Sequence, residues 1–242
     1  MNDVSRLATA SEASLVHAGL KTPRAAAVAG IVFSILMICS LWLLGLELPV
    51  DPRKVGVWLQ TSTERVSLAL NLIPFAGIAF LWFLGVLRDR LGAMEDRFFA
   101  TVFLGSGLLF LGMIFVAASA MGGLILAYSA DIRTMPDASA FIFGRAFARD
   151  VMRIYAFKMV AVFMITTSTL VLRTGIATRW IAFLGYASAI FIMITSNYIG
   201  WAMFVFPIWV LVVSIHILFD NLRRPPHPAT DNSRPAKPEI CQ

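Results

Sequence analysis

Residues 180–219 read WIAFLGYASAIFIMITSNYIGWAMFVFPIWVLVVSIHILF, and this stretch decides the fold of the chain. It runs for forty residues without a lysine, arginine, aspartate or glutamate. A helix needs about 20 apolar residues to cross the hydrocarbon of a bilayer, so there is room for two crossings. The polar, turn-forming segment 194–200 divides the stretch, and we predict two helices, 180–194 and 200–219, joined by a tight hairpin. One span followed by a re-entrant piece is the alternative.

The composition of the whole chain also indicates a membrane protein. Of its 242 residues, 59% are hydrophobic and 14% are charged, against roughly 25% charged residues in soluble domains. A soluble chain this apolar would expose large patches and aggregate, whereas a bilayer requires apolar surfaces. The net charge of +6 does not indicate nucleic-acid binding, because the basic residues cluster at the ends of apolar runs, where they set membrane topology.

Four more apolar runs precede this pair of helices. We predict spans at 25–46, 66–87, 98–128 and 156–172, with a short interfacial helix at 54–65 before the second span. The third span is rich in glycine, alanine and serine, which let helices approach closely, so we expect it at the centre of the bundle. The prediction is therefore an all-α, polytopic transmembrane helix bundle of about six spans, with five as the alternative.

The two ends of the chain lack the apolar character of the central domain, residues 25–219. Residues 1–24 are polar and mixed in charge, unlike a cleavable signal peptide, and residues 220–242 are rich in proline and charge, which predicts a disordered tail. With six spans, twelve of the 20 lysines and arginines lie on the side of the termini and eight on the other side. Because basic residues are enriched in cytoplasmic segments, we predict that both ends are cytoplasmic.

Sequence patterns for catalysis and metal binding are missing. The chain contains no HExxH, GxSxG, P-loop or CxxC sequence. No aspartate or glutamate falls inside a predicted span, although proton-coupled transporters usually need such a group. Cys39 lies in a span and Cys241 lies beside the C-terminus, so neither a disulfide nor a metal site is expected. We therefore expect a protein that is not an enzyme and has no cofactor.

The sequence feature that points most clearly to a functional site lies in the segment FIFGRAFARDVMRIY, residues 141–155. At 100° per residue, Arg145, Arg149 and Arg153 share one face of a helix, and four apolar side chains lie on the opposite face. Arginine binds phosphate and carboxylate groups well, so these three residues are a candidate site for an anion or a lipid headgroup at the outer membrane surface. The alternative is a solvated face of an interfacial helix, with neighbouring aspartates balancing the charge.

Four polar residues at or near membrane depth, Asn71, Thr166, Thr169 and Asn197, are candidates for a solute pathway. Hydrogen bonding between helices is their more ordinary role. We therefore predict a non-enzymatic accessory or scaffold membrane protein, with a small-solute transporter or channel as the alternative. A lipid-handling enzyme ranks last, because no nucleophile–base pair is visible. The expected partners are the bilayer, anionic lipid, and other membrane proteins or further copies of the chain.

Residues 56–110, GVWLQTSTERVSLALNLIPFAGIAFLWFLGVLRDRLGAMEDRFFATVFLGSGLLF, resemble a group of uncharacterised multi-span membrane proteins of actinobacteria. The segment TPRAAAVAGIVFSILM, residues 22–37, is similar to the same group. The resemblance covers about the first half of the chain well and the rest more loosely. It implies a bacterial plasma-membrane location, and it implies no activity and no functional residues.

Overall fold

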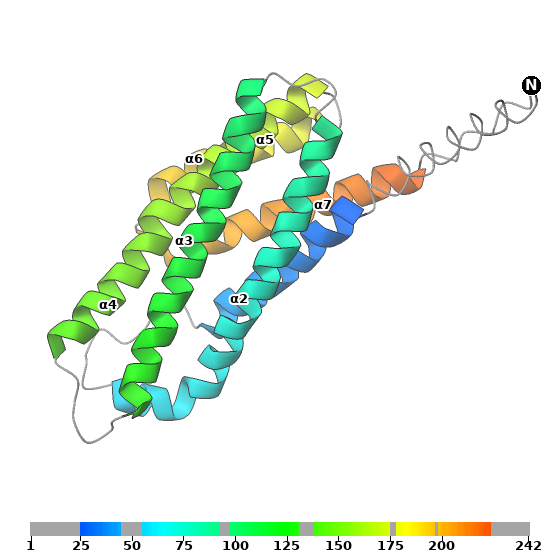
Figure 1. The fold of residues 1–242 in the computed structure, drawn as a ribbon. Coiled ribbons are helices and arrows are strands. Elements are labelled where there is room, and N and C mark those ends of the chain that lie inside the picture. The colour runs from blue at the N-terminus through cyan, green and yellow to red at the C-terminus, as the bar shows by residue number, and fades with distance from the viewer. Residues whose placement is uncertain are drawn as a thin grey trace, which may run out of the picture.

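The computed structural model describes residues 25–44, 55–91, 97–130, 138–174, 178–196 and 198–223, and within these ranges it contains helices and no strand (Figure 1). The elements are a first helix Ala25–Leu43, α2 Val55–Leu91, α3 Arg97–Ala130, α4 Ala138–Asp150, the π-helix η2 Val151–Ala156, α5 Phe157–Thr174, α6 Arg179–Thr195, the 3-10 helix η3 Gly200–Phe204 and α7 Val205–Arg223. The predicted all-α class is confirmed.

Five of the described helical segments are long and apolar enough to cross a membrane. They are Ala25–Leu43, Glu64–Arg88, Phe98–Ala127, Ser139–Arg173 and Gly200–Phe219. A sixth apolar helix, α6, has 17 residues. This agrees with the predicted bundle of about six spans, five being the lower number.

The apolar stretch 180–219 forms a helical hairpin, as predicted. At its open end the hydroxyl of Thr178 lies 3.5 Å from Nε2 of His216. Near the turn, the rings of Phe191 and Trp201 lie 5.5 Å apart, centroid to centroid. The two helices are therefore antiparallel along the whole length of α6, which is the arrangement expected of two successive spans.

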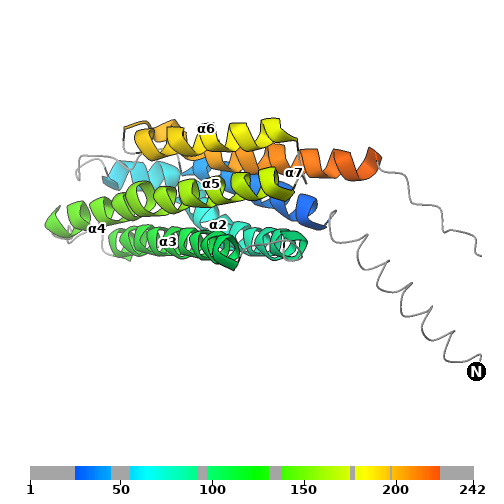
Figure 2. The ribbon, with the colours of Figure 1, turned by 90° about the horizontal axis from the view of Figure 1, so that it is seen from above.

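The described part of the chain starts and finishes at the same end of the bundle. In Figures 1 and 2 the first helix begins beside the last turns of α7, and we call this the terminal end and the opposite one the far end. A Cβ atom added at Gly30, early in the first helix, would meet the hydroxyl of Ser214 on α7. The helices between them thus make an even number of passes along the bundle.

The helix at the centre of the bundle is α5, and the prediction that the third span is central is wrong. In an apolar stretch of 18 residues within the span Ser139–Arg173, 61% is buried inside the protein. The corresponding value for the span in α3 is 22%. A Cβ atom added at Gly105, Gly112 or Gly123 of α3 would meet nothing within 4 Å. The small residues of α3 are spread around the helix: Ser106, Gly107 and Ala117 are buried, whereas Gly112, Ser119 and Gly123 are exposed.

Three helical segments are longer than a bilayer requires. The predicted interfacial helix 54–65 and second span form one continuous helix, α2, with a bend in its first turns (Figure 1). In the same way α4, η2 and α5 follow one another without a break over residues 138–174. At 1.5 Å per residue these segments and α3 are about 50–55 Å long, against about 30 Å of hydrocarbon. They therefore project beyond the bilayer.

The middle of the bundle is filled by phenylalanine rings from five helices. The ring of Phe80 on α2 lies 4.8 to 5.9 Å from four other rings, measured between centroids. Its neighbours, which with Phe80 we call the phenylalanine cluster, are Phe33, Phe110, Phe163 and Phe206. All five side chains are fully buried. Contacts of this kind hold the helices together and leave no room for solvent between them.

Candidate functional site

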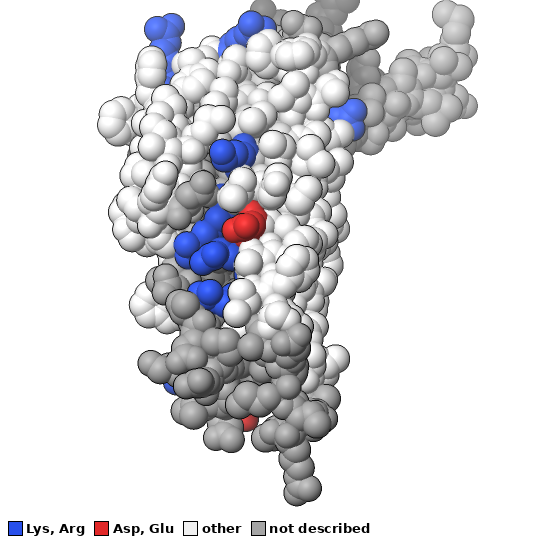
Figure 3. All heavy atoms as spheres, turned by 90° about the vertical axis from the view of Figure 1, so that its left-hand side faces the viewer, with Lys and Arg blue, Asp and Glu red and all other residues white. Residues whose placement is uncertain are grey.

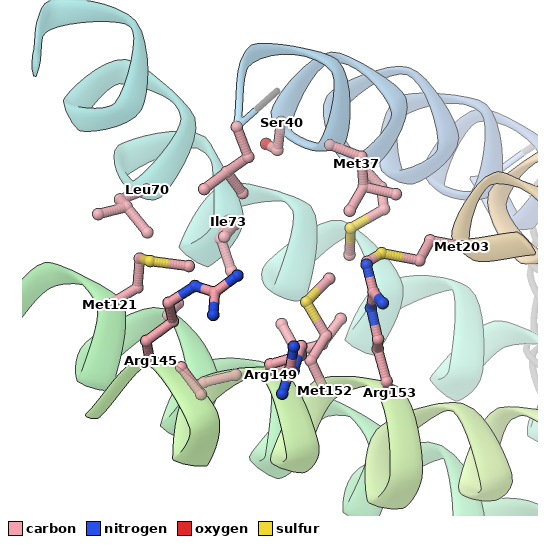
Figure 4. Close-up of a pocket in the computed structure, with 16 residues that line it drawn as sticks. Met37, Ser40, Leu70, Ile73, Met121, Arg145, Arg149, Met152, Arg153 and Met203 are labelled. Carbon is pink, nitrogen blue, oxygen red and sulfur yellow. The ribbon is translucent and has the colours of Figure 1, made fainter. Parts of the chain in front are cut away.

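A cavity of about 120 Å³ lies near the far end of the bundle, and we call it the arginine pocket (Figure 4). Its lining comes from the first helix, α2, α3, α4 with η2, and η3, and it includes Arg145, Arg149 and Arg153. A buried water needs roughly 10–15 Å³ on the same kind of measure, so the pocket has room for about ten waters or for a small chemical group.

The π-helix η2 brings the third arginine into line with the other two. Residues four apart on a regular helix are rotated by about 40°, so two such steps move a side chain about 80° around the axis. In η2 the backbone N–H of Phe157 donates to the carbonyl oxygen of Met152, five residues earlier. In this wider turn the angle between successive residues about the helix axis is smaller. Arg153 therefore projects in a direction closer to that of Arg145 and Arg149. The sequence predicted the shared face but not the π-helix.

The apolar face of α4 points away from the bundle. Phe143 is 72% exposed and Phe147 is 42% exposed, and their rings stack at 6.2 Å between centroids. The arginines on the other side of the same helix line the pocket. A simple interfacial helix would turn its basic face to water and its apolar face to the membrane or the protein core. Here the basic face is turned towards the neighbouring helices instead.

The charge of the pocket lining is positive. Among the described residues that line it, three are arginines and none is an aspartate or a glutamate. Asp150 is near but outside the lining: its Oδ1 is 4.0 Å from Nε of Arg149, and both side chains are about half exposed. An exposed ion pair of this kind is worth about 0–1 kcal/mol. Asp137, the other neighbouring aspartate, lies outside the described residues. Figure 3 shows basic side chains gathered beside an acidic one in the middle of this face, with further basic side chains towards its upper edge.

Ser40 of the first helix supplies a hydroxyl without a hydrogen-bond partner in the wall of the pocket. Its side chain is fully buried, and none of the described groups bonds to its Oγ atom. Ser34, six residues earlier, instead donates to the carbonyl oxygen of Gly30 at 2.7 Å, as helical serines often do. Leaving a buried hydroxyl unpaired costs about 1–3 kcal/mol, and a polar ligand in the pocket would remove that cost.

The position of the pocket along the bundle can be measured along the continuous helical segment 138–174, formed by α4, η2 and α5. Arg173 lies at the terminal end, with its guanidinium 4.4 Å from the centre of the Phe99 ring. Arg153 lies twenty residues earlier, about 30 Å away, which equals the thickness of the hydrocarbon. If Arg173 marks one boundary, Arg153 lies at the other, and Arg149 lies beyond it. Phe163 is ten residues from both Arg153 and Arg173, so the phenylalanine cluster lies midway.

Three of the four residues proposed for a solute pathway lie in the described part of the chain, Asn71 on α2 and Thr166 and Thr169 one turn apart on α5. Asn71 is exposed on α2. Thr166 and Thr169 donate to carbonyl oxygens of their own helix at 2.8 and 2.9 Å, and the Thr169 hydroxyl also lies 2.7 Å from that of Tyr186. Asn197 lies outside the described residues. The described threonines therefore have the ordinary structural role, bonding within and between helices.

Several lining residues could not have been found from the sequence. Ser40 and the methionines of the pocket have no distinctive spacing, and their elements meet only in the folded chain. The methionines are Met37, Met121, Met152 and Met203. Among the described residues, no three histidine, cysteine, aspartate or glutamate side chains come close enough together to hold a metal ion.

No family model, no curated protein and no solved structure matches the chain. Function is therefore inferred from the pocket itself.

Proposed function

We propose that this chain is a non-enzymatic, multi-pass protein of a bacterial plasma membrane that binds an anionic group in the arginine pocket. The observation that carries the proposal is the meeting of three arginines and an unpaired buried hydroxyl around one cavity. Arginine remains charged at any physiological pH and forms paired hydrogen bonds with phosphate or carboxylate oxygens. A group of this kind would be held by charge and by direct hydrogen bonds.

The distribution of basic residues supports an orientation with the pocket at the outer surface. With six spans, twelve of the 20 lysines and arginines lie on the side of the termini, among them Arg88, Arg173 and Arg179, and eight lie on the other side, three of them in the pocket lining. Basic residues that flank spans favour the cytoplasmic side. Both ends of the chain would then be cytoplasmic, and the far end would face outwards.

The phenylalanine cluster favours a binding or scaffold role over a transporter or channel. It lies between the pocket and the terminal end, and all five of its rings are fully buried. A permeating solute needs polar groups along its path, whereas these rings offer none. A small-solute transporter remains the second candidate, with the pocket as the site that would first receive the solute.

The proposal is tested by measuring how anionic lipid stabilises the purified protein. We expect phosphatidylglycerol to raise the unfolding temperature in detergent more than phosphatidylcholine does. The double substitution Arg149→Gln and Arg153→Gln should abolish this difference. The matched control is Arg88→Gln with Arg179→Gln, which removes the same charge at the opposite end.

Two results would contradict the proposal. If the parent protein shows no preference for anionic lipid and inorganic phosphate does not raise its unfolding temperature either, the pocket does not bind an anion under these conditions. If both double variants lose the preference equally, the effect depends on net charge and not on the pocket. The unfolding temperature without lipid shows whether each variant is folded.

A further inference from the structure

The lining of the arginine pocket has two chemically different sides. All three arginines project from α4 and η2, as Figure 4 shows. The facing side, formed by the first helix, α2, α3 and η3, is apolar except for Ser40. A ligand that matches both sides has an anionic group and an apolar body.

Methionine is prominent on the apolar side. Four of the 11 methionines of the chain line this cavity, and three of them, Met37, Met121 and Met203, lie on the apolar side, while Met152 comes from η2. The thioether groups of Met37 and Met203 are both drawn near the outer end of the Arg153 guanidinium in Figure 4. Methionine is unbranched and flexible, so it adapts to irregular apolar ligands. A small free anion would make no use of this apolar lining, whereas an acyl chain would pack against it.

The polar side suits a phosphate group. The planar guanidinium group of an arginine can donate two hydrogen bonds to two oxygens of a phosphate. Arg149 and Arg153 lie on successive turns of the continuous segment α4–η2, so both can approach the same phosphate. The hydroxyl of Ser40 lies in the wall on the facing helix, buried and without a partner among the described groups, so a phosphate or ester oxygen would accept from it once the neighbouring side chains shift to expose it. These three groups come from two helical segments on opposite sides of the cavity.

The depth of the pocket suits a ligand that stays in the membrane. Arg153 lies about one hydrocarbon thickness from Arg173. If Arg173 marks one boundary of the hydrocarbon, Arg153 lies at the other, close to the level of the phospholipid phosphate groups. Basic side chains also reach the surface of the molecule, beside one acidic side chain (Figure 3). A lipid can therefore present its phosphate from the side without leaving its leaflet.

We propose that the arginine pocket binds an anionic phospholipid, with the phosphate at Arg149, Arg153 and Ser40 and part of an acyl chain against Met37 and Met203. This inference rests on the proposed function, because it assumes that the pocket binds an anion. It adds that the anion belongs to a lipid and that the apolar lining contributes to binding.

The test uses four probes that separate the two parts of the ligand. Dihexanoyl phosphatidic acid has both a phosphate and acyl chains, glycerol 3-phosphate and inorganic phosphate lack the chains, and dihexanoylglycerol lacks the phosphate. Each is titrated into the full chain in a neutral detergent, and the unfolding temperature is measured. Phosphatidic acid should bind at least about tenfold more tightly than glycerol 3-phosphate, which corresponds to burying about two methylene groups.

Substitutions assign the two parts of the ligand to the two sides of the pocket. Arg149→Gln with Arg153→Gln should weaken phosphatidic acid binding about tenfold or more, and Ser40→Ala should weaken it about two- to tenfold. The lysine variants of both arginines keep the charge and should retain part of the affinity. Met37→Gln with Met203→Gln should weaken only the probes that carry acyl chains.

The control for the methionine variants is Met193→Gln on α6, a half-exposed residue outside the pocket lining, which should change nothing. Equal binding of phosphatidic acid and glycerol 3-phosphate would overturn the lipid inference and leave the proposed anion site intact. Equal binding of phosphatidic acid and dihexanoylglycerol, unaffected by the arginine variants, would overturn both.

Discussion

The ring of Phe80 on α2 lies 4.8 Å from the ring of Phe33 on the first helix, with 41° between the ring planes. Phe80 also contacts rings from α3, α5 and α7, so one side chain connects five helices. The same rings lie between the arginine pocket and the terminal end. They therefore hold the bundle together and also close the pocket on the side of the terminal end.

Replacement of Phe80 by alanine should therefore destabilise the protein strongly. Removing a buried ring costs about 3–5 kcal/mol of the free energy of unfolding, since the cavity does not collapse completely. The matched control is Phe75→Ala, five residues earlier on the same helix, where the side chain is 62% exposed and faces outwards. Unfolding curves in detergent, titrated with a denaturing detergent, measure the difference. Similar losses for both variants would contradict the central role of Phe80.

Gly185 of α6 should not tolerate a side chain, whereas Gly112 of α3 should. A Cβ atom at Gly185 would meet the hydroxyl of Ser168 and lie 3.1 Å from Nε1 of Trp209, while one at Gly112 meets nothing within 4 Å. We expect Gly185→Ala to cost about 1–3 kcal/mol through overpacking. Gly112→Ala should give a gain of about 0.5–1 kcal/mol, because alanine favours the helix.

A second substitution tests the cause of the Gly185 effect. Ser168→Ala removes the hydroxyl that the new methyl group would meet, so it should recover part of the stability lost in Gly185→Ala. The double-mutant cycle is measured by thermal unfolding of the purified protein. Strict additivity of the two changes would show that the predicted contact is not the source of the loss.

The hydrogen bond between Thr169 and Tyr186 should contribute a modest stabilisation between α5 and α6. The two hydroxyl oxygens are 2.7 Å apart. Tyr186→Phe removes this bond and keeps the ring, and hydrogen bonds between membrane helices are worth about 0.6–1.7 kcal/mol. Tyr198→Phe is the control, because that side chain is 86% exposed. A loss in the control that equals the loss in Tyr186→Phe would count against a specific contribution of this bond.

Both ends of the chain should be protected from reagents added outside the cell. In a Cys39→Ser background Cys241 is the single cysteine, and a membrane-impermeant maleimide should label it only after the cells are opened. A cysteine introduced beside the arginine segment, Ser139→Cys, should be labelled in intact cells, because Ser139 is exposed at the far end. The opposite pattern would show that the protein is inserted the other way round.

The helices could be predicted because the bilayer imposes a simple rule on the sequence. Apolar runs of about twenty residues predicted where spans occur, and the polar segment 194–200 predicted the hairpin between α6 and α7. Packing is less predictable, because lipid and protein neighbours both accept apolar side chains. The glycines of α3 illustrate this: in the sequence they suggested a central helix, and in the structure a Cβ atom added at Gly105, Gly112 or Gly123 would meet nothing within 4 Å.

The arginine pocket could be predicted only in part. The spacing of Arg145, Arg149 and Arg153 indicated a common helical face, since that depends on local geometry alone. The alignment of Arg153 with the other two arginines depends on the π-helix, which the sequence VMRIYA does not reveal. Ser40 and the methionines come from segments distant in the sequence, so their meeting depends on the tertiary fold.

The phenylalanine cluster also determines across which layer of the protein most of the membrane potential would drop. A dry aromatic layer has a low dielectric constant, so most of the voltage drop would occur across it, while a hydrated pocket shares the potential of the solution outside. Moving one charge through a full 100 mV changes its energy by about 2.3 kcal/mol. An anion that enters the pocket from the outer side crosses almost none of this field, so its occupancy should be the same in energised and de-energised cells.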